Sequence, residues 1–101
     1  LNDAEYAARV ARHYSAKGYG QRRLKDELYR RGVPRDYWEE ALEQAGDSCA
    51  AIDAFLEKKL AGKTPDRKEL KKVTDALARR GFSWAQIDEA VRRCGIEPGE
   101  F

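Results

Sequence analysis

Apolar residues recur along this chain at intervals of three and four, the spacing that buries one face of an α-helix. In the first stretch they are Tyr6, Ala7, Val10, Ala11 and Tyr14. Asp3 stands before this stripe, where its side chain can accept hydrogen bonds from the free amides of a first turn. Gly18 follows the stripe, and glycine commonly ends a helix in the left-handed conformation. The pattern therefore predicts a helix over residues 3–17.

Five further stretches with this spacing predict helices over about 21–31, 34–45, 48–60, 66–80 and 84–94. Asp47 or Ser48 can cap the fourth helix, and Thr64 or Asp66 can cap the fifth. No run of residues alternates with the period of two that a half-buried strand requires. The chain is therefore predicted to be all-α.

The sixth stretch has the clearest start. Ser83 and Gln86 are spaced as a capping box, and Phe82 and Ile87 are spaced as a hydrophobic staple across that cap. The corresponding residues of the third stretch are Val33, Pro34 and Trp38. The staple is thus kept there, while proline, which suits the first turn of a helix, replaces the capping serine.

A repeat organises the whole chain, because residues 28–46 recur as residues 77–95, 49 positions later and without a gap. The identical pairs are Leu28/Leu77, Arg30/Arg79, Arg31/Arg80, Gly32/Gly81, Glu40/Glu89, Ala41/Ala90 and Gly46/Gly95. A fixed period with matched glycines indicates one supersecondary unit used twice. We predict two tandem three-helix repeats that form an elongated or curved helical array. The expected domains are residues 1–46 and 47–98, with 99–101 as a tail or vector scar.

The charge pattern is more informative than the net charge of +2. The second helix of each repeat carries a net charge of +3, whereas the third helix of the first repeat carries −3. A solvated charged face explains either cluster alone. Two basic helices at equivalent places would also form one extended positive surface if the repeats stacked in register. Such a surface suits phosphate groups or an acidic protein groove.

The residue types needed for chemistry are scarce. His13 is the single histidine, and Cys49 and Cys94 fall on apolar stripes, where a thiol acts as a small hydrophobe. Adjacent acidic pairs occur at 39–40 and 88–89, but neighbouring helical residues do not face each other. We predict neither an enzyme nor a bound metal or cofactor.

Other features bear on where the protein acts. No apolar run approaches the ~18 residues of a membrane span, and no signal peptide is visible. We expect a cytoplasmic monomer. The start at Leu1 rather than methionine indicates a fragment.

The repeat also predicts different environments for the two tryptophans. Trp38 aligns with Ile87 and is predicted to be core. Trp84 aligns with Arg35, a surface position, so it is either a contact between the repeats or an aromatic side chain that faces a partner.

Several short motifs, in order, resemble the RecX family of recombination regulators. Those in the first repeat are Lys17-Gly18-Tyr19-Gly20, Arg23-Leu24-Lys25-Asp26-Glu27-Leu28 and Arg31-Gly32-Val33. Those in the second are Lys58-Lys59, Lys71-Lys72 and Leu77-Ala78-Arg79-Arg80-Gly81-Phe82-Ser83, with Ile87. They resemble the middle and last repeats of the family over roughly residues 1–95. Family members usually have a further N-terminal repeat.

This resemblance implies a function. RecX proteins lie in the groove of the filament that RecA recombinase forms on single-stranded DNA, inhibit its activities and promote its disassembly. The basic positions that match the family are Lys17, Arg23, Lys25, Arg31, Lys58, Lys59, Lys71, Lys72 and Arg80. The charge pattern adds Arg22, Arg30, Lys68 and Arg79, and Trp84 joins them as an exposed aromatic.

An alternative stays open: three short helices can also form a direct DNA-binding module. Arg92 and Arg93 on the sixth helix suit that hypothesis, whereas the acidic third helix argues against it.

Overall fold

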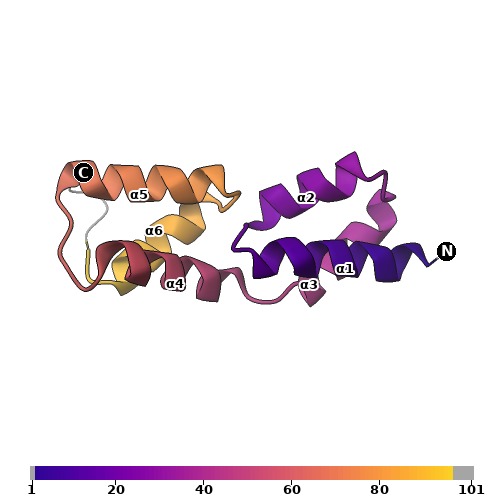
Figure 1. Cartoon of the computed structure of the whole chain (residues 1–101), viewed down its shortest axis with the longest axis horizontal. Coiled ribbons are helices and arrows are strands. Elements are labelled where there is room, and N and C mark those ends of the chain that lie inside the picture. Colours follow the sequence, from indigo (N-terminus) through magenta and orange to yellow (C-terminus); the bar gives the residue numbers. More distant parts are fainter. Residues whose placement is uncertain (1, 97–101) are drawn as a thin grey trace.

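The computed structural model describes residues 2–96, and in that range it contains six α-helices, one short 3-10 helix and no strand (Figure 1). The helices are α1 (Asp3–Ala16), α2 (Gln21–Arg30), α3 (Trp38–Gln44), α4 (Ser48–Leu60), α5 (Arg67–Arg79) and α6 (Trp84–Arg93). The 3-10 helix η1 (Arg35–Tyr37) precedes α3. The prediction of an all-α chain is confirmed.

Each half of the chain folds around its own hydrophobic core. In the first module, α1–α3, the core includes Leu24, Leu28 and Leu42. In the second, α4–α6, it includes Leu56, Leu77 and Ile87. The two modules lie end to end along the long axis (Figure 1), so the molecule measures 50 × 18 × 16 Å. The prediction of an elongated array of two three-helix units is therefore confirmed.

Several helices begin at the capping residues that the sequence predicts, and two begin differently. Ser83 and Gln86 form the predicted capping box, while Asp47 and Asp66 cap α4 and α5. The cap of α1 is Asn2 rather than Asp3, because the Asn2 side chain accepts from the Glu5 amide at 3.1 Å. The capping residue is thus one position earlier than expected.

The third helix begins differently from the prediction. Pro34 has an extended ψ of 143°, the next turn is the 3-10 helix η1, and α-helical geometry begins only at Trp38. Trp38 is half-buried rather than fully buried. Its indole N–H donates to the Val33 carbonyl at 2.9 Å, which supplies the hydrogen-bond partner that this group requires away from water.

The two cysteines lie in different surroundings. Cys49 is half-buried, but Cys94 is exposed at the C-cap of α6. The prediction that both lie on a buried stripe is wrong for Cys94, since the helix ends there and its last residue is no longer held against α4 and α5.

The two predicted domain bounds, 1–46 and 47–98, stay a prediction. Residues 97 and 98 and the predicted tail or vector scar at 99–101 lie outside the described residues.

The modules meet where the end of α5 abuts the start of α2. The Gly20 amide donates to the Arg80 carbonyl at 2.9 Å, and the Arg22 amide donates to the Gly81 carbonyl at 3.1 Å. The Arg22 guanidinium also donates to the Ala78 carbonyl. A helix leaves its first amides and last carbonyls without partners, and here one helix end supplies what the other lacks. We call these five residues the junction.

Two glycines allow this close approach. A Cβ atom at Gly20 would lie 2.5 Å from the Gly81 carbonyl carbon, and one at Gly81 would lie 2.6 Å from the Arg23 amide nitrogen. Both neighbours are backbone atoms, which cannot rotate away. Gly81 also has a φ of +105°, so it is constrained twice.

Replacing Gly20 by Ala should open the junction without unfolding either module. Gly20 has an ordinary φ of −88°, so the substitution adds a clash and no left-handed strain. We expect the free energy of unfolding in denaturant to fall by about 1–3 kcal/mol. The radius of gyration from small-angle X-ray scattering should exceed that of the unsubstituted chain.

The control for this prediction is Gly32→Ala, at the position that corresponds to Gly81. Gly32 has a φ of +72° but nothing within 4 Å of an added Cβ. It should lower stability through backbone strain alone and leave the radius of gyration unchanged. An unchanged radius for Gly20→Ala would contradict the junction.

Candidate interaction surface

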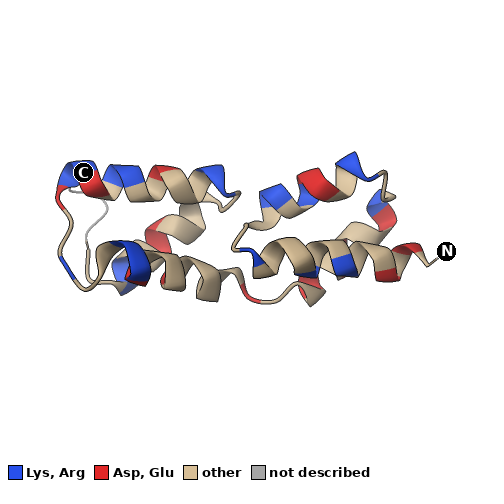
Figure 2. Ribbon diagram, in the orientation of Figure 1, with Lys and Arg blue, Asp and Glu red and all other residues tan. Residues whose placement is uncertain are grey.

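The junction places α5 and α2 in line along one edge of the molecule, and Lys and Arg residues occur along both helices (Figure 2). We call this edge the α5–α2 ridge. Its two halves come from equivalent places in the repeat, as the charge pattern predicted. Their cations, however, have different surroundings.

On α5, three cations form an exposed stripe. Lys68, Lys72 and Arg79 lie within an arc of about 40° around the helix, given 3.6 residues per turn. Among the described residues none of them makes an ion pair or side-chain hydrogen bond. Lys71 is beside the stripe and pairs with Asp75 at 2.9 Å. This half of the ridge presents cations that are open to a partner.

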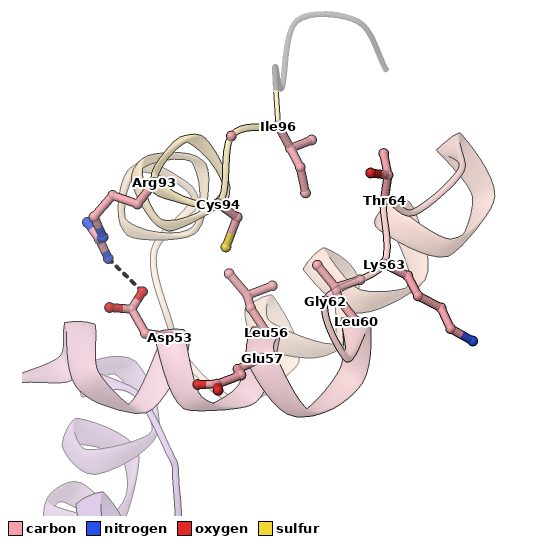
Figure 3. A pocket seen from close by; sticks show the side chains of 11 residues that line it. Asp53, Leu56, Glu57, Leu60, Gly62, Lys63, Thr64, Arg93, Cys94 and Ile96 are labelled. Carbon is pink, nitrogen blue, oxygen red and sulfur yellow. Dashed lines mark hydrogen bonds and ion pairs between the residues drawn. The ribbon is translucent and has the colours of Figure 1, made fainter.

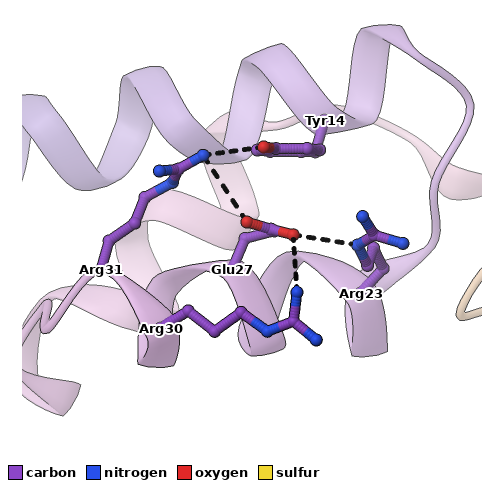
Figure 4. A network of polar contacts seen from close by, with 5 residues as sticks. All are labelled: Tyr14, Arg23, Glu27, Arg30 and Arg31. Atoms are coloured by element: carbon purple, nitrogen blue, oxygen red, sulfur yellow. Dashed lines mark hydrogen bonds and ion pairs between the residues drawn. The ribbon is translucent and has the colours of Figure 1, made fainter.

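On α2, the cations surround a buried carboxylate. Glu27 is only 5% exposed, and its oxygens lie 3.1 Å from Arg23 Nε, 3.8 Å from Arg30 Nη1 and 3.6 Å from Arg31 Nη2 (Figure 4). A buried charge is costly unless it is paired. These arginines therefore satisfy Glu27, and part of their positive charge is neutralised inside the module.

Tyrosine side chains contact two of these arginines, Arg23 and Arg31. The Arg31 guanidinium donates to the Tyr14 hydroxyl at 2.7 Å, and this hydrogen bond raises the pKa of Arg31 above its ordinary value. The Arg23 guanidinium lies 4.5 Å from the ring centre of Tyr19 and 5.8 Å from that of Tyr14. Such cation–π contacts keep the side chains in place against the end of α1.

The junction uses two more of the predicted residues. Arg22 donates to α5 as described, and Arg80 Nη1 lies 3.4 Å from the Gly18 carbonyl. The Arg80 guanidinium also lies 4.8 Å from the ring centre of Phe55. Both arginines therefore connect the modules, whatever else they contact.

The remaining predicted residues are distributed around the molecule. Lys25 is exposed on α2, and Lys17 follows α1 with its ammonium 5.7 Å from the Tyr14 ring centre. Lys58 and Lys59 are exposed in the last turn of α4. Trp84 is 53% exposed and lines a cavity of about 450 Å³ with residues of α5 in its own module. The role of all these residues in binding stays a prediction.

Glu27 was not among the residues predicted to form the site. Its counterpart in the second repeat is Ala76, so the difference between the two halves of the ridge was visible in the alignment. Glu27 also stands four residues from Arg23 and Arg31 and three from Arg30, the spacings at which helical side chains meet. The spacing did not predict that this carboxylate is buried.

A cavity of about 780 Å³ lies between the C-terminal half of α4, the turn that follows it and the end of α6 (Figure 3). Leu56, Leu60 and Ile96 line it, and Arg93 pairs with Asp53 at 2.9 Å on one side. Cys49, near that pair, hydrogen-bonds to Asp47; this bond and partial burial raise the pKa of the thiol. The raised pKa keeps the Cys49 thiol protonated, and Arg93 and Asp53 are paired with each other. This site therefore presents no activated nucleophile.

In the described range 2–96, no cluster of His, Cys, Asp and Glu could hold a metal ion. None of the helices described there is long and apolar enough to cross a membrane.

Two linked three-helix domains with a shared basic edge define the class: a tandem three-helix repeat protein. Residues 2–42 match the family model described as "RecX, second three-helix domain", and residues 47–91 match "RecX, third three-helix domain". The chain belongs to the RecX family, which confirms the resemblance given by its motifs.

Curated relatives named "Regulatory protein RecX" agree with this assignment. The relative from Vibrio parahaemolyticus is 36% identical over 90% of this chain and 60% of its own length. Those from Pseudomonas entomophila and Bacillus pumilus are 34% and 35% identical over 86% and 91% of this chain, and over 57% and 37% of their own lengths. The chain thus spans about three-fifths of the Vibrio and Pseudomonas proteins. No solved structure matches it.

Replacing Glu27 by Gln should test the buried cluster. The change keeps the shape of the side chain but removes the charge shared by three guanidinium groups. We expect the free energy of unfolding, measured with denaturant, to fall by about 1–3 kcal/mol. The freed arginines should also bind heparin, a polyanion, more tightly at low salt.

Glu40→Gln is the matched control, because Glu40 is exposed and has no ion pair among the described residues. It should change stability by less than about 0.5 kcal/mol. Equal effects of the two substitutions would show that the cluster contributes nothing.

Proposed function

We propose that this chain is a non-enzymatic regulator that binds the filament of RecA recombinase on single-stranded DNA and inhibits its activities. Membership of a family of regulatory proteins supports this proposal. On this proposal the chain acts in the cytoplasm, as a monomer laid along the filament. The α5–α2 ridge is the surface that makes the contact.

The continuity of the ridge is the observation that carries the proposal. A filament presents the same groups again and again along its length, so a partner gains by contacting it over an extended edge. The junction joins α5 and α2 end to end, and the molecule is 50 Å long but only 16–18 Å across. A slender molecule of this kind fits a groove better than a flat surface.

Within the ridge, the α5 half is the better candidate for direct contact. Lys68, Lys72 and Arg79 are exposed and, in the described part of the chain, make no ion pair that a partner would have to displace. By contrast, Arg23 and Arg31 would have to leave Glu27 and their tyrosines before binding anything else. We therefore assign contact first to the α5 stripe and a supporting role to the α2 arginines.

The rival function, direct recognition of duplex DNA, has less support. It would rest on α6, where Arg92 is exposed. Arg93, however, is paired with Asp53 at 2.9 Å and with Glu89 at 3.6 Å. Those acidic partners would face the phosphates of any DNA laid against this helix. We favour the filament over bare duplex DNA for this reason.

Reversing two charges of the α5 stripe should weaken filament inhibition. In Lys68→Glu/Lys72→Glu both substituted residues are exposed, and position 68 lies in the first turn of α5, where the helix dipole favours negative charge. The fold should therefore persist. We expect the concentration that half-inhibits filament ATPase to rise about tenfold, equivalent to about 1.4 kcal/mol, and filament binding by wild type to weaken steeply with salt.

The matched control is Arg9→Glu/Arg12→Glu, which makes the same change in net charge on α1. It should alter inhibition far less than the α5 variant. Equal inhibition by wild type and the α5 variant would argue against the ridge. Retention of duplex DNA without any recombinase, abolished by Arg92→Glu, would favour the rival function.

A further inference from the structure

We propose that Trp84 and the cavity beside it bind a segment of the filament's protein, not of its DNA, and this proposal rests on the function proposed above. The segment places an apolar side chain in the cavity and a lysine or arginine next to it. This contact is separate from the α5 stripe. The stripe attracts a partner by charge, whereas the cavity holds it by apolar burial.

The cavity of about 450 Å³ beside Trp84, which we call the Trp84 groove, is lined by residues of α5 and α6 in the second module. Leu70 and Val91 belong to the core and are only 4% and 1% exposed, so they give the groove a fixed apolar floor. Trp84 is 53% exposed. Because tryptophan has a large apolar surface and is enriched among the residues that dominate binding energy, the groove would gain from an apolar occupant.

The indole of Trp84 lacks the contacts that the other tryptophan makes. Among residues 2–96, its N–H makes no hydrogen bond and its ring makes no aromatic or cation contact. The Trp38 indole, by contrast, donates to the Val33 carbonyl, and the Arg35 guanidinium lies 5.1 Å from its ring centre. Arg35 aligns with Trp84, so the position that covers a ring in the first module carries an uncovered ring in the second. The backbone carbonyl of a protein segment would supply the acceptor that this N–H requires once it is covered.

The charged residues of the groove favour a protein occupant over nucleic acid. Arg67 and Lys71 are matched by Asp75 and Asp88, so their formal charges cancel. A phosphate backbone would gain no net attraction here and would meet two carboxylates. Asp88 is exposed and makes no ion pair in the part of the chain that the structure describes, so it is open to a cation of the partner. Such a pairing at the edge of an apolar contact fixes the register of the partner.

The groove borders the α5 stripe, so one partner can occupy both. At about 100° per residue around the helix, Lys71 and Asp75 stand between the stripe and Thr74, which lines the groove. Lys71 and Asp75 pair with each other at 2.9 Å. Exposed pairs at this spacing contribute little to stability, so both residues are able to exchange partners when a segment binds. The stripe then provides attraction at long range and the groove provides the close contact.

The test observes Trp84 directly while the chain binds. The sequence has two tryptophans, so Trp38→Phe leaves Trp84 as the single one. A hydroxylated tryptophan analogue incorporated at this position can be excited without exciting the tryptophans of the recombinase. Adding RecA filaments should reduce the quenching of its fluorescence by acrylamide, because the ring becomes covered. Adding the same single-stranded DNA without recombinase should leave the quenching unchanged.

A second measurement compares variants in filament binding. Trp84→Ala should weaken binding about tenfold or more, the loss that removal of an aromatic anchor produces. The slope of its affinity against salt should stay that of wild type, because the lost contact carries no charge, whereas Lys68→Glu/Lys72→Glu should reduce that slope. Trp84→Phe should retain part of the affinity. The matched control is Tyr29→Ala, which removes an exposed aromatic side chain from the first module and should change nothing.

The outcomes separate this site from the function on which it rests. If wild type bound no filament, the proposed function and the site would both be overturned. If wild type bound but Trp84→Ala bound equally well, or acrylamide quenching of Trp84 did not change, the groove alone would be overturned. Equal losses for Trp84→Ala and Tyr29→Ala would overturn it too. Protection of Trp84 by single-stranded DNA without recombinase would likewise overturn it, because the occupant would be a nucleobase.

Discussion

The arrangement of this molecule depends on one contact between helix ends. The last carbonyls of α5 accept hydrogen bonds from the first amides of α2, although these residues are about 60 positions apart in the chain. Each end is a place where a helix cannot satisfy its own backbone, and the two dipoles meet with opposite signs. Because Gly20 and Gly81 have no side chains, the backbones come close enough for this to happen. The alignment of the modules follows from that contact.

The contact also determines how charge is presented. Separately, α2 and α5 would be two short basic helices on two small domains. In line they form one edge along a molecule 50 Å long. The edge is not uniform, since Glu27 pairs with arginines on α2, whereas the matching position on α5 is Ala76 and, among the described residues, Lys68, Lys72 and Arg79 make no ion pair. Arginine, with its planar group, suits the packed cluster, and lysine, strongly hydrated and mobile, suits the exposed stripe. The two modules share a fold but present their cations differently.

Much of this fold can be predicted from the sequence because its signals are local. The stripes, the matched glycines and the Ser83–Gln86 capping box depend on residues within a few positions of one another. The prediction fails where the position of a residue depends on a contact with a residue far away in the sequence. The alignment shows that Gly20 lacks a counterpart glycine in the second repeat, but not that α5 supplies its hydrogen-bond partner. Likewise, the charge pattern assigned Arg22 and the family resemblance assigned Arg80 to a binding face, but neither indicated that both side chains reach across to the other module.

The cap of each basic helix offers a way to understand the array as a whole. A helix that begins with a side-chain cap has already satisfied one of its first amides, so it gains less by docking onto another helix. A helix that begins with glycine leaves these amides free and exposes its backbone to close approach. In this chain α5 is of the first kind, through Asp66, and α2 is of the second, through Gly20. One residue at the start of α2 and of α5 therefore distinguishes the helix whose start docks on the other module from the helix whose start is capped by its own side chain.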